Sequence, residues 1–468
     1  MSRPKVVVMG AGSFFFGRPA IWQMTDSEIL RGGTLALVDT KPDVLDTFKK
    51  LAERAIEATG APTELVATTD RREALKDADF VIFTFSERNA YHRGLDTEIA
   101  LNHGVRMCSG DTIGPGGIFR ACREIPKALD MARDIEELAP HAWIINFVNP
   151  TTALGMALRR YAPNVRSFAI CDGLHLPHYE LRILKAVGIL PEDASSIPPE
   201  VQQKLDLRVG GVNHFTWMFH FHYDGKDYMP AWREHQARQA EEERKSAEAA
   251  LTGDVDGNAY SKRKFNVTYA MRLFDIFKAW PDRISHTKEY VPYFQGRGHA
   301  PVVPEPISLF DKDNRIKNMD ERYDETVEYA TGKKRIQEFI DTGKPDHATD
   351  IIESMWGGLG KPFFVNTANR GAITNLGDDA YLELRCDIDM KGPRPQPVGD
   401  MPLGLVGLTQ QVLDTHELTA IAAAEFNREA LLQAMVVDPI VNSIEDAEGI
   451  IEETFERQRD GLDPTWYK

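Results

Sequence analysis

Two short pieces of the sequence carry side chains that could hold a metal ion and move protons. Cys171-Asp172 follows the apolar run Val165–Ile170, and Asn213-His214 opens another such run. A thiolate and an imidazole can together bind a transition metal and leave positions open for substrate oxygens. Each residue alone also fits a structural role, because free cysteine is among the most buried residue types. The pair therefore raises a metal-site hypothesis that these residues do not settle by themselves.

The start of the chain predicts a dinucleotide site. Gly10-Ala11-Gly12 follows the Val-rich run Lys5–Met9 and precedes an apolar stretch that can open a helix. Glycine lets the backbone approach a pyrophosphate closely, and free amides at the helix start can bind its oxygens. Asp39 ends the next predicted strand, where a carboxylate accepts the ribose hydroxyls and repels the 2′-phosphate of NADP. We therefore predict NAD as the cofactor, with contacts from Gly10, Gly12, Ser13, Phe14 and Asp39.

One position departs from the usual dinucleotide motif. Phe15 stands where its third glycine is expected, and Gly17 comes two residues later. The alternative interpretation is an α/β fold whose first turn is merely rich in glycine. The strand before the turn and the carboxylate of Asp39 favour the cofactor site.

Apolar runs alternate with helical patterns over the first part of the chain. The predicted strands are Lys5–Met9, Thr34–Val38, Glu64–Ala67, Phe80–Phe83, Trp143–Val148 and Val165–Ile170. Helical periodicity is found over Val44–Ala58 and Ile118–Leu138. This alternation predicts a Rossmann-type, doubly wound parallel sheet, in which ligands bind at the carboxyl ends of the strands. Cys171-Asp172 lies at such an end.

The pattern changes after about residue 190. Leu205–Tyr223 is typical of paired strands with Gly210-Gly211 between them, and Arg233–Leu251 of a charged helix. We expect two domains: an NAD-binding Rossmann-like domain over residues 1–195, and an α+β domain over 196–468 for substrate, metal and subunit contacts.

Composition indicates the class of protein. The chain has 468 residues, a net charge of −16 and four cysteines. The negative charge argues against nonspecific binding of nucleic acid. Few cysteines, none in a CxxC pair, suit a reducing cytoplasm. There is neither a signal-peptide pattern at the N-terminus nor an apolar run of transmembrane length. We expect a cytoplasmic protein with no nucleic-acid or membrane partner.

Several segments together resemble glycoside hydrolase family 4, the NAD- and metal-dependent glycosidases, and the related NAD-dependent sulfoquinovosidases. In chain order the segments are Lys5–Gly12, Gly110–Pro126 (GDTIGPGGIFRACREIP), Asn146–Pro150, Cys171-Asp172, Asn213-His214, Pro281–Phe294 and Val365–Glu383. The resemblance spans nearly the whole chain, and the combination of segments is more specific than any one of them.

The resemblance implies a role for each matching position. Cys171 and His214 would hold a divalent metal, usually manganese. Asn149 would contact the cofactor and the sugar hydroxyls. Asp172 would be the general acid found in members that cleave α-linked phosphoglucosides, which favours an α-glycoside. The base would lie in the segment 277–293, with Asp282 as the first candidate and Tyr290 as the second.

The mechanism implied by the resemblance is oxidation followed by elimination. A hydride passes from C3 of the sugar to NAD, and the ketone so formed acidifies the proton on C2. A base removes this proton while the metal stabilises the developing charge, and Asp172 protonates the leaving oxygen. Water then adds at C1 and the hydride returns, so that the cofactor is recycled. The resemblance also implies a homodimer or homotetramer.

The substrate prediction rests on a departure from the family. Members that act on 6-phosphosugars carry an Arg-Val-Gly-Gly-like segment where this chain has Ser86–Ala90. Arg88, His92, Arg93 and Arg120 lie near it in sequence, and guanidinium groups bind carboxylates and sulfonates well. We predict an anionic, unphosphorylated α-glycoside, such as a sulfoquinovoside or hexuronide, with Arg88, Arg120, Asn149 and His286 as substrate contacts. An exposed basic face, or a neutral α-galactoside or α-glucoside, remains the alternative.

Two other functions fit parts of the sequence. A lactate/malate-type 2-hydroxyacid dehydrogenase shares the two-domain layout but uses an Arg/His/Asp site without a metal. A noncatalytic NAD-sensing protein would bind the cofactor without turnover. The Cys171 and His214 pair and the many family-like polar positions favour the glycosidase.

Overall fold

The first predicted strand lies inside a large sheet. Val6, Val7 and Val8 are fully buried in β1 (Lys5–Met9), which pairs in parallel with β2 (Thr34–Val38) and β4 (Phe80–Phe83). Branched apolar side chains suit a strand that is covered on both faces. The computed structural model describes residues 3–251, 265–297 and 307–468, without the side chains of Asp172 and of residues 247–251.

The sheet confirms the predicted doubly wound order. The other strands are β3 (Glu64–Thr68), β5 (Trp143–Asn146), β6 (Arg166–Ala169), β7 (Leu205–Val212), β8 (Phe215–Tyr223), β9 (Lys226–Asp227), β10 (Trp280–Pro281), β11 (Pro362–Ala368), β12 (Tyr381–Asp389) and β13 (Gly392–Pro395). Along its main path the order is β10-β8-β7-β12-β11-β6-β5-β4-β1-β2-β3. The run from β6 to β3 is parallel, which is the Rossmann arrangement.

The same sheet continues into the second half of the chain. Ala169 of β6 pairs with Asn366 of β11, Asn366 with Glu383 of β12, and Glu383 with Gly211 of β7. Asn366 and Glu383 are fully buried. The strands that precede Cys171 and His214 are thus joined by one row of paired residues.

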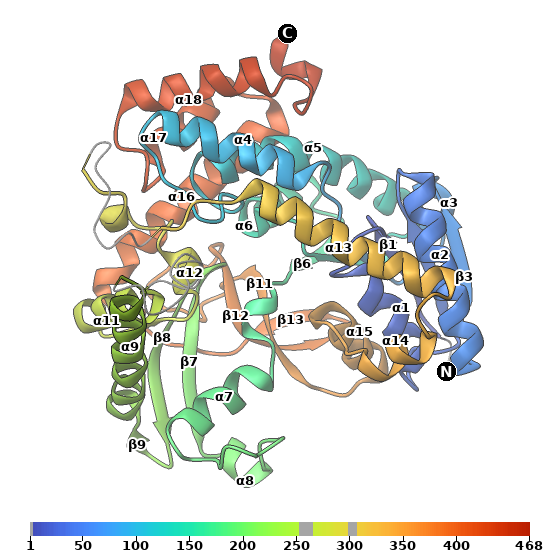
Figure 1. Cartoon of the computed structure of the whole chain (residues 1–468), viewed down its shortest axis with the longest axis horizontal. Helices are drawn as coiled ribbons and strands as arrows, with labels where there is room; N and C mark the ends of the chain where they lie inside the picture. The colour runs from blue at the N-terminus through green and yellow to red at the C-terminus, as the bar shows by residue number, and fades with distance from the viewer. Residues whose placement is uncertain (1–2, 252–264, 298–306) are drawn as a thin grey trace.

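Helices cover the sheet (Figure 1). Those of the first half are α1 (Gly17–Asp26), α2 (Pro42–Thr59), α3 (Arg71–Leu75), α4 (Asn89–Asn102), α5 (Gly114–Leu138), α6 (Thr151–Tyr161), α7 (His178–Ala186) and α8 (Pro199–Gln202). Those of the second half are α9 (Met229–Leu251), α11 (Asn266–Phe277), α12 (Ile284–Thr287), α13 (Lys312–Thr331), α14 (Ile336–Thr342), α15 (His347–Gly357), α16 (Leu403–Glu425), α17 (Arg428–Val437) and α18 (Ile444–Arg457). Short 3-10 turns are η1 (Asp172–Leu174), η2 (Pro292–Phe294) and η3 (Pro464–Tyr467). Within the described ranges, no helix has the length and apolar character needed to cross a membrane.

Helices of the two halves pack on one another. Helix α16 lies against α5 and α6, and α13 lies against α2 and α4. A large apolar core joins both halves, and a second one lies between α7, β8, α9 and α11. The proposed division at residue 195 therefore falls in a chain whose halves share both the sheet and the main core.

One prediction about the second half is wrong. Gly210-Gly211 lies inside β7, and the turn of the β7–β8 hairpin is Asn213-His214. Glycine is needed in the strand because a Cβ on Gly211 would lie 2.4 Å from the carbonyl oxygen of Phe215. His214 has a φ of +65°, a conformation typical of two-residue hairpin turns. The hairpin therefore presents His214 at its tip.

Candidate active site

Cys171 and His214 meet at the carboxyl edge of the parallel strands. Cys171 follows β6 and immediately precedes η1, and its Sγ lies 3.1 Å from Nε2 of His214. Metal bonds of about 2.3 Å to sulfur and about 2.1 Å to nitrogen place two such ligand atoms roughly 3 to 4 Å apart. The two predicted ligands are thus close enough to share one ion. Among the described residues, no group of three or more His, Cys, Asp or Glu side chains could hold a metal.

The imidazole of His214 is held in its neutral form. Burial, together with nearby Arg283, lowers the pKa of His214 to about 3. The ring stacks on that of His286 with centroids 4.1 Å apart, and burial lowers the pKa of His286 as well. A neutral imidazole has the lone pair that a metal ligand needs. His286, which the sequence predicts as a substrate contact, thus lies directly beside His214.

Two side chains fix the position of Cys171. His347 Nδ1 on α15 lies 2.9 Å from the carbonyl oxygen of Cys171, and Arg283 Nη2 lies 3.8 Å from its Sγ. The guanidinium of Arg283 also fills the space beside Gly173, where a Cβ would lie 2.6 Å from it. Both contacts hold the Cys171 side chain and backbone in place beside His214.

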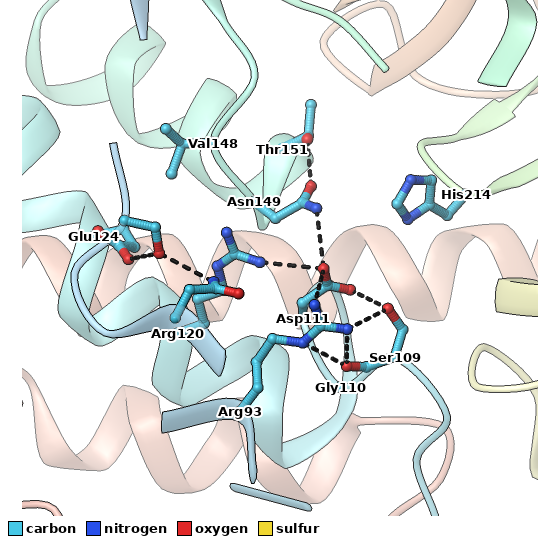
Figure 2. Close-up of polar contacts among 12 residues, drawn as sticks. Arg93, Ser109, Gly110, Asp111, Arg120, Glu124, Val148, Asn149, Thr151 and His214 are labelled. Carbon is cyan, nitrogen blue, oxygen red and sulfur yellow. Dashed lines mark hydrogen bonds and ion pairs between the residues drawn. The ribbon is translucent and has the colours of Figure 1, made fainter. Parts of the chain in front are cut away.

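A buried carboxylate, Asp111, organises the loop before α5 (Figure 2). Arg93 and Arg120 approach its Oδ2 at 3.5 Å and 3.2 Å, and the Ser109 hydroxyl donates to Oδ1. Burial alone would raise the pKa of Asp111, but the two guanidinium groups hold it well below its usual range. Asp111 is therefore ionised, and it fixes the two arginines in place.

Asn149 lies between this carboxylate and α6. Its Nδ2 donates to Asp111 Oδ2 at 3.4 Å, and its Oδ1 accepts a hydrogen bond of 2.6 Å from the Thr151 hydroxyl. Figure 2 shows Asn149, Arg120 and Arg93 around Asp111, with His214 to one side. The predicted residues Asn149 and Arg120 are thus brought together near the Cys171 and His214 pair.

Two members of the predicted basic cluster lie elsewhere. Arg88 forms an ion pair of 2.6 Å with the exposed Asp460. His92 is buried, and its Nδ1 lies 3.0 Å from Gln458 Oε1. The structure does not bring either residue to Arg93 and Arg120.

The two candidate bases have different surroundings. Asp282 accepts a hydrogen bond of 2.7 Å from the Tyr179 hydroxyl, while its buried Oδ2 has no partner among the described residues. Burial raises the pKa of Asp282 to about 7. The Tyr290 hydroxyl donates to the carbonyl oxygen of Asn213 at 2.9 Å, and burial raises its pKa well above the usual range. Asp282 is thus the better proton acceptor near neutral pH.

The side chain of Asp172, the predicted general acid, lies outside the described part of the structure. Its backbone begins η1, directly after Cys171. Its assignment therefore stays a prediction.

The glycine turn has the shape of a phosphate cradle. Gly10 has a φ of +88°, and a Cβ there would lie 2.7 Å from the Cα of Phe85. The amide of Gly12 donates to Asp39 Oδ2 at 2.9 Å, which places this carboxylate at the turn. The amide of Ser13 donates to the carbonyl oxygen of Gly10, so that Ser13 would reach a cofactor through its hydroxyl and not through its amide. The turn otherwise fits a dinucleotide.

Sequence reasoning did not assign several polar residues at this edge. They are the buried Asp111, Glu289, His347 and Glu383 and the partly buried Arg283. Asp111, Glu289 and Glu383 lie inside the family-like segments. An acidic residue within such a segment was therefore the signal that the sequence offered. His347 carried none, because only the folded chain brings α15 to Cys171.

Glu289 carries a prediction about stability. Its Oε1 accepts the amides of Ser109 and Gly110 at 2.6 Å and 3.1 Å, its Oε2 has no partner among the described residues, and burial raises its pKa to about 7. The folded state therefore keeps a proton that the unfolded state loses above its usual pKa of 4.5. Stability should fall as the pH rises between these two values, by up to about 3 kcal/mol from this group.

The Glu289→Gln variant tests this directly. Its amide mimics the protonated acid, so that its unfolding free energy should match that of the unaltered chain at about pH 4, below both pKa values, and exceed it at about pH 8. Denaturant unfolding at several pH values measures the difference. The exposed Glu321→Gln serves as the control. An equal pH dependence of E289Q and the unaltered chain would contradict the prediction.

The model of the family 4 glycosyl hydrolases matches residues 5–182, and the model of that family's C-terminal domain matches residues 209–441. This chain belongs to family 4 of the glycosyl hydrolases. The match supports the glycosidase interpretation over the dehydrogenase and the noncatalytic ones.

Known relatives of this family 4 enzyme match it over most or nearly all of its length. An alpha-galactosidase of Bacillus subtilis is 28% identical, covering 98% of this chain and 99% of its own. An alpha-galacturonidase of Thermoanaerobacterium saccharolyticum is 27% identical over 84% of this chain and 82% of its own. The solved structure of a 6-phospho-alpha-glucosidase from gut microorganisms, in complex with NAD and Mn2+, superposes with a TM-score of 0.76 at 21% identity, covering 98% of this chain and 99% of that one.

Proposed function

We propose that this family 4 glycosidase binds NAD and a divalent metal, manganese by preference, and cleaves an anionic, unphosphorylated α-glycoside. The observation that carries the proposal is the 3.1 Å pair of Cys171 and His214 at the same sheet edge as the glycine turn. The similar 6-phospho-alpha-glucosidase contains NAD and Mn2+.

Residues for both bound groups are present. Gly10, Gly12, Phe14 and Asp39 would hold the cofactor, with Ser13 contributing its hydroxyl. Cys171 and His214 would hold the metal. When bound, NAD supplies a reversible hydride acceptor for C3 of the sugar, and the metal supplies a Lewis acid. A soft thiolate and an imidazole suit manganese or another transition metal better than calcium.

The chain itself would move two protons. Asp282, with a free oxygen and a pKa raised to about 7, would accept the proton from C2 of the sugar. Asp172, which follows Cys171, would donate a proton to the departing glycosidic oxygen. Tyr290 is the alternative base. Its hydroxyl already donates to Asn213, so that it would need a stronger base to release its proton.

The charge of the site favours an anionic substrate. Arg93, Arg120 and Arg283 lie near the Cys171 and His214 pair, and Asp111 balances only part of their charge. Where phosphosugar enzymes carry their Arg-Val-Gly-Gly-like segment, the Ser86 hydroxyl instead donates to the buried Glu124 at 2.6 Å. A carboxylate at this place disfavours a phosphate. One relative is named alpha-galacturonidase, and a galacturonide is an α-glycoside whose negative charge is a carboxylate. A sulfoquinovoside or a hexuronide meets these conditions.

Three further assignments belong to the proposal. A homodimer or homotetramer rests on the family resemblance, a cytoplasmic location on the few cysteines, and a division into NAD-binding and substrate domains near residue 195 on the change of sequence pattern. Sedimentation analysis of the purified chain tests the first.

The testing experiment is hydrolysis of nitrophenyl α-glycosides with NAD and Mn2+ each present or omitted. The panel contains the glucoside, galactoside, glucuronide, galacturonide and sulfoquinovoside. We expect cleavage only with both additions, no net NADH, and at least a tenfold higher kcat/KM for a charged sugar than for its neutral counterpart, since one charge-assisted contact is worth about that much. The reaction in deuterated water should place deuterium at C2.

Each part of the proposal can fail separately. Cleavage without NAD would overturn the oxidative mechanism. Equal rates for the glucoside and the glucuronide would leave the mechanism intact and overturn the anionic substrate.

A further inference from the structure

Helix α13 brings residues of the second half of the chain to the helices that flank the glycine turn. In Figure 1 it crosses the molecule between α4 and the helices near the N-terminus. The Tyr323 hydroxyl lies 3.2 Å from Thr47 Oγ1 on α2, and Glu325 pairs with Arg18 on α1 at 2.9 Å. Helix α13 is thus anchored on both helices that follow the first two strands.

Two arginines of α13 lie over the aromatic residues of the turn. Arg315 Cζ is 5.2 Å from the ring centre of Phe15, and Arg322 Cζ is 5.6 Å from the same ring. Arg322 also lies 5.8 Å from the ring of Phe14. Residues seven positions apart are about two helical turns apart, so that both arginines share one face of α13. This face is turned toward the segment between Gly12 and Gly17.

The two guanidinium groups have no acidic partner. Over the described ranges, no ion pair or hydrogen bond joins the side chain of Arg315 or Arg322 to a carboxylate, and the buried Nε of Arg315 has no partner. Arg18 and Lys334, by contrast, both pair with Glu325. Burial and nearby Arg93 lower the pKa of Arg315, and the opposing effect of Asp111 does not offset them. Such a pair is ready to bind an anion.

We propose that Arg315 and Arg322 bind the pyrophosphate of the dinucleotide. The backbone of the glycine turn would contact the pyrophosphate from one side, and the two guanidinium groups of α13 would contact it from the other. Guanidinium groups match phosphate oxygens in charge and in geometry. The proposal rests on the proposed cofactor, and it adds a contact from the second half of the chain to a turn of the first.

This contact suits a cofactor that is not consumed. A dehydrogenase must exchange its cofactor in each cycle, whereas an enzyme that returns the hydride within one cycle has no such need. A helix anchored over the turn would slow the release of NAD. Cofactor binding would also tie α13 to α1 and α2.

The test is calorimetric titration of the full-length chain, freed of cofactor, with ADP-ribose, which contains the pyrophosphate but no nicotinamide. Arg315→Gln and Arg322→Gln should each raise the Kd about tenfold, since a charge-assisted hydrogen bond is worth about that factor. The exposed Lys317→Gln on the same helix, which removes the same charge, should leave the Kd within twofold. Arg315→Lys and Arg322→Lys should recover part of the affinity, and thermal melting of each variant checks its fold.

The outcomes separate this inference from the proposed function. An unchanged Kd for ADP-ribose in both glutamine variants would overturn the inference and leave the cofactor proposal intact. A rise confined to the KM of the anionic glycoside would also overturn it, by assigning the arginines to the substrate. Failure of the unaltered chain to bind ADP-ribose would overturn both.

Discussion

Replacing Cys171 with serine should lower kcat/KM for the best glycoside by about a thousandfold or more. The substitution removes the sulfur that lies 3.1 Å from His214 Nε2, and a Lewis acid contributes several kcal/mol to stabilising charge in a transition state. The binding of Mn2+, followed by electron paramagnetic resonance of the free ion, should weaken at least tenfold. The Kd for NAD should stay within twofold, because the glycine turn is untouched.

Cys386→Ser is the matched control for this experiment. Cys386 is buried in β12, where its thiol donates to the carbonyl oxygen of Leu384 and pairs with no histidine in the part of the chain that the structure describes. A serine can keep that bond, so that metal binding should not change. Equal Mn2+ affinity in C171S and C386S would remove Cys171 from the metal site.

Asp282→Asn should abolish the exchange of the C2 proton with solvent and lower kcat by about 10² to 10⁴. The amide cannot accept a proton, while the transient reduction of NAD by hydride from C3 of the sugar should remain visible at the NADH absorbance. In the unaltered enzyme kcat/KM should rise as the pH passes about 7, because the raised pKa of Asp282 must be exceeded before the carboxylate can act. Deuterium incorporation at C2, followed by NMR, measures the exchange.

The Tyr179→Phe variant further tests whether Asp282 is the base that removes the C2 proton. The Tyr179 hydroxyl donates to Asp282 at 2.7 Å and favours its charged form. Its loss should move the rise of kcat/KM to higher pH. Tyr290→Phe should retain C2 exchange; if it loses exchange and D282N keeps it, Tyr290 is the base.

The parts of the fold that follow from local pattern were predictable. Every strand of the Rossmann sheet was found within a few residues of its bounds, because buried valine-rich runs and glycine turns carry their own signal. Asp39 at the end of β2 likewise followed from spacing, and the structure places its carboxylate at Gly12.

Contacts between distant segments were not predictable in this way. Gly210-Gly211 has the composition of a turn, but the close approach of the Phe215 carbonyl requires glycine within the strand. Arg88 lies near Arg93 in sequence, yet it pairs with Asp460 near the C-terminus. His347 and Arg315 reach the site only because α15 and α13 fold back onto the first half. Such positions depend on tertiary packing, which no local pattern records.

The row of paired residues from Ala169 through Asn366 and Glu383 to Gly211 has a mechanical consequence. It joins the strands that precede the two proposed metal ligands, so that Cys171 and His214 cannot separate unless strands of the sheet part. An ion that bound only the intact pair would therefore raise the free energy of unfolding of the whole sheet, by an amount that grows with the logarithm of its concentration. Metal binding to Cys171 and His214 and unfolding of the sheet would then be coupled, so that a measurement of either one reports on the other.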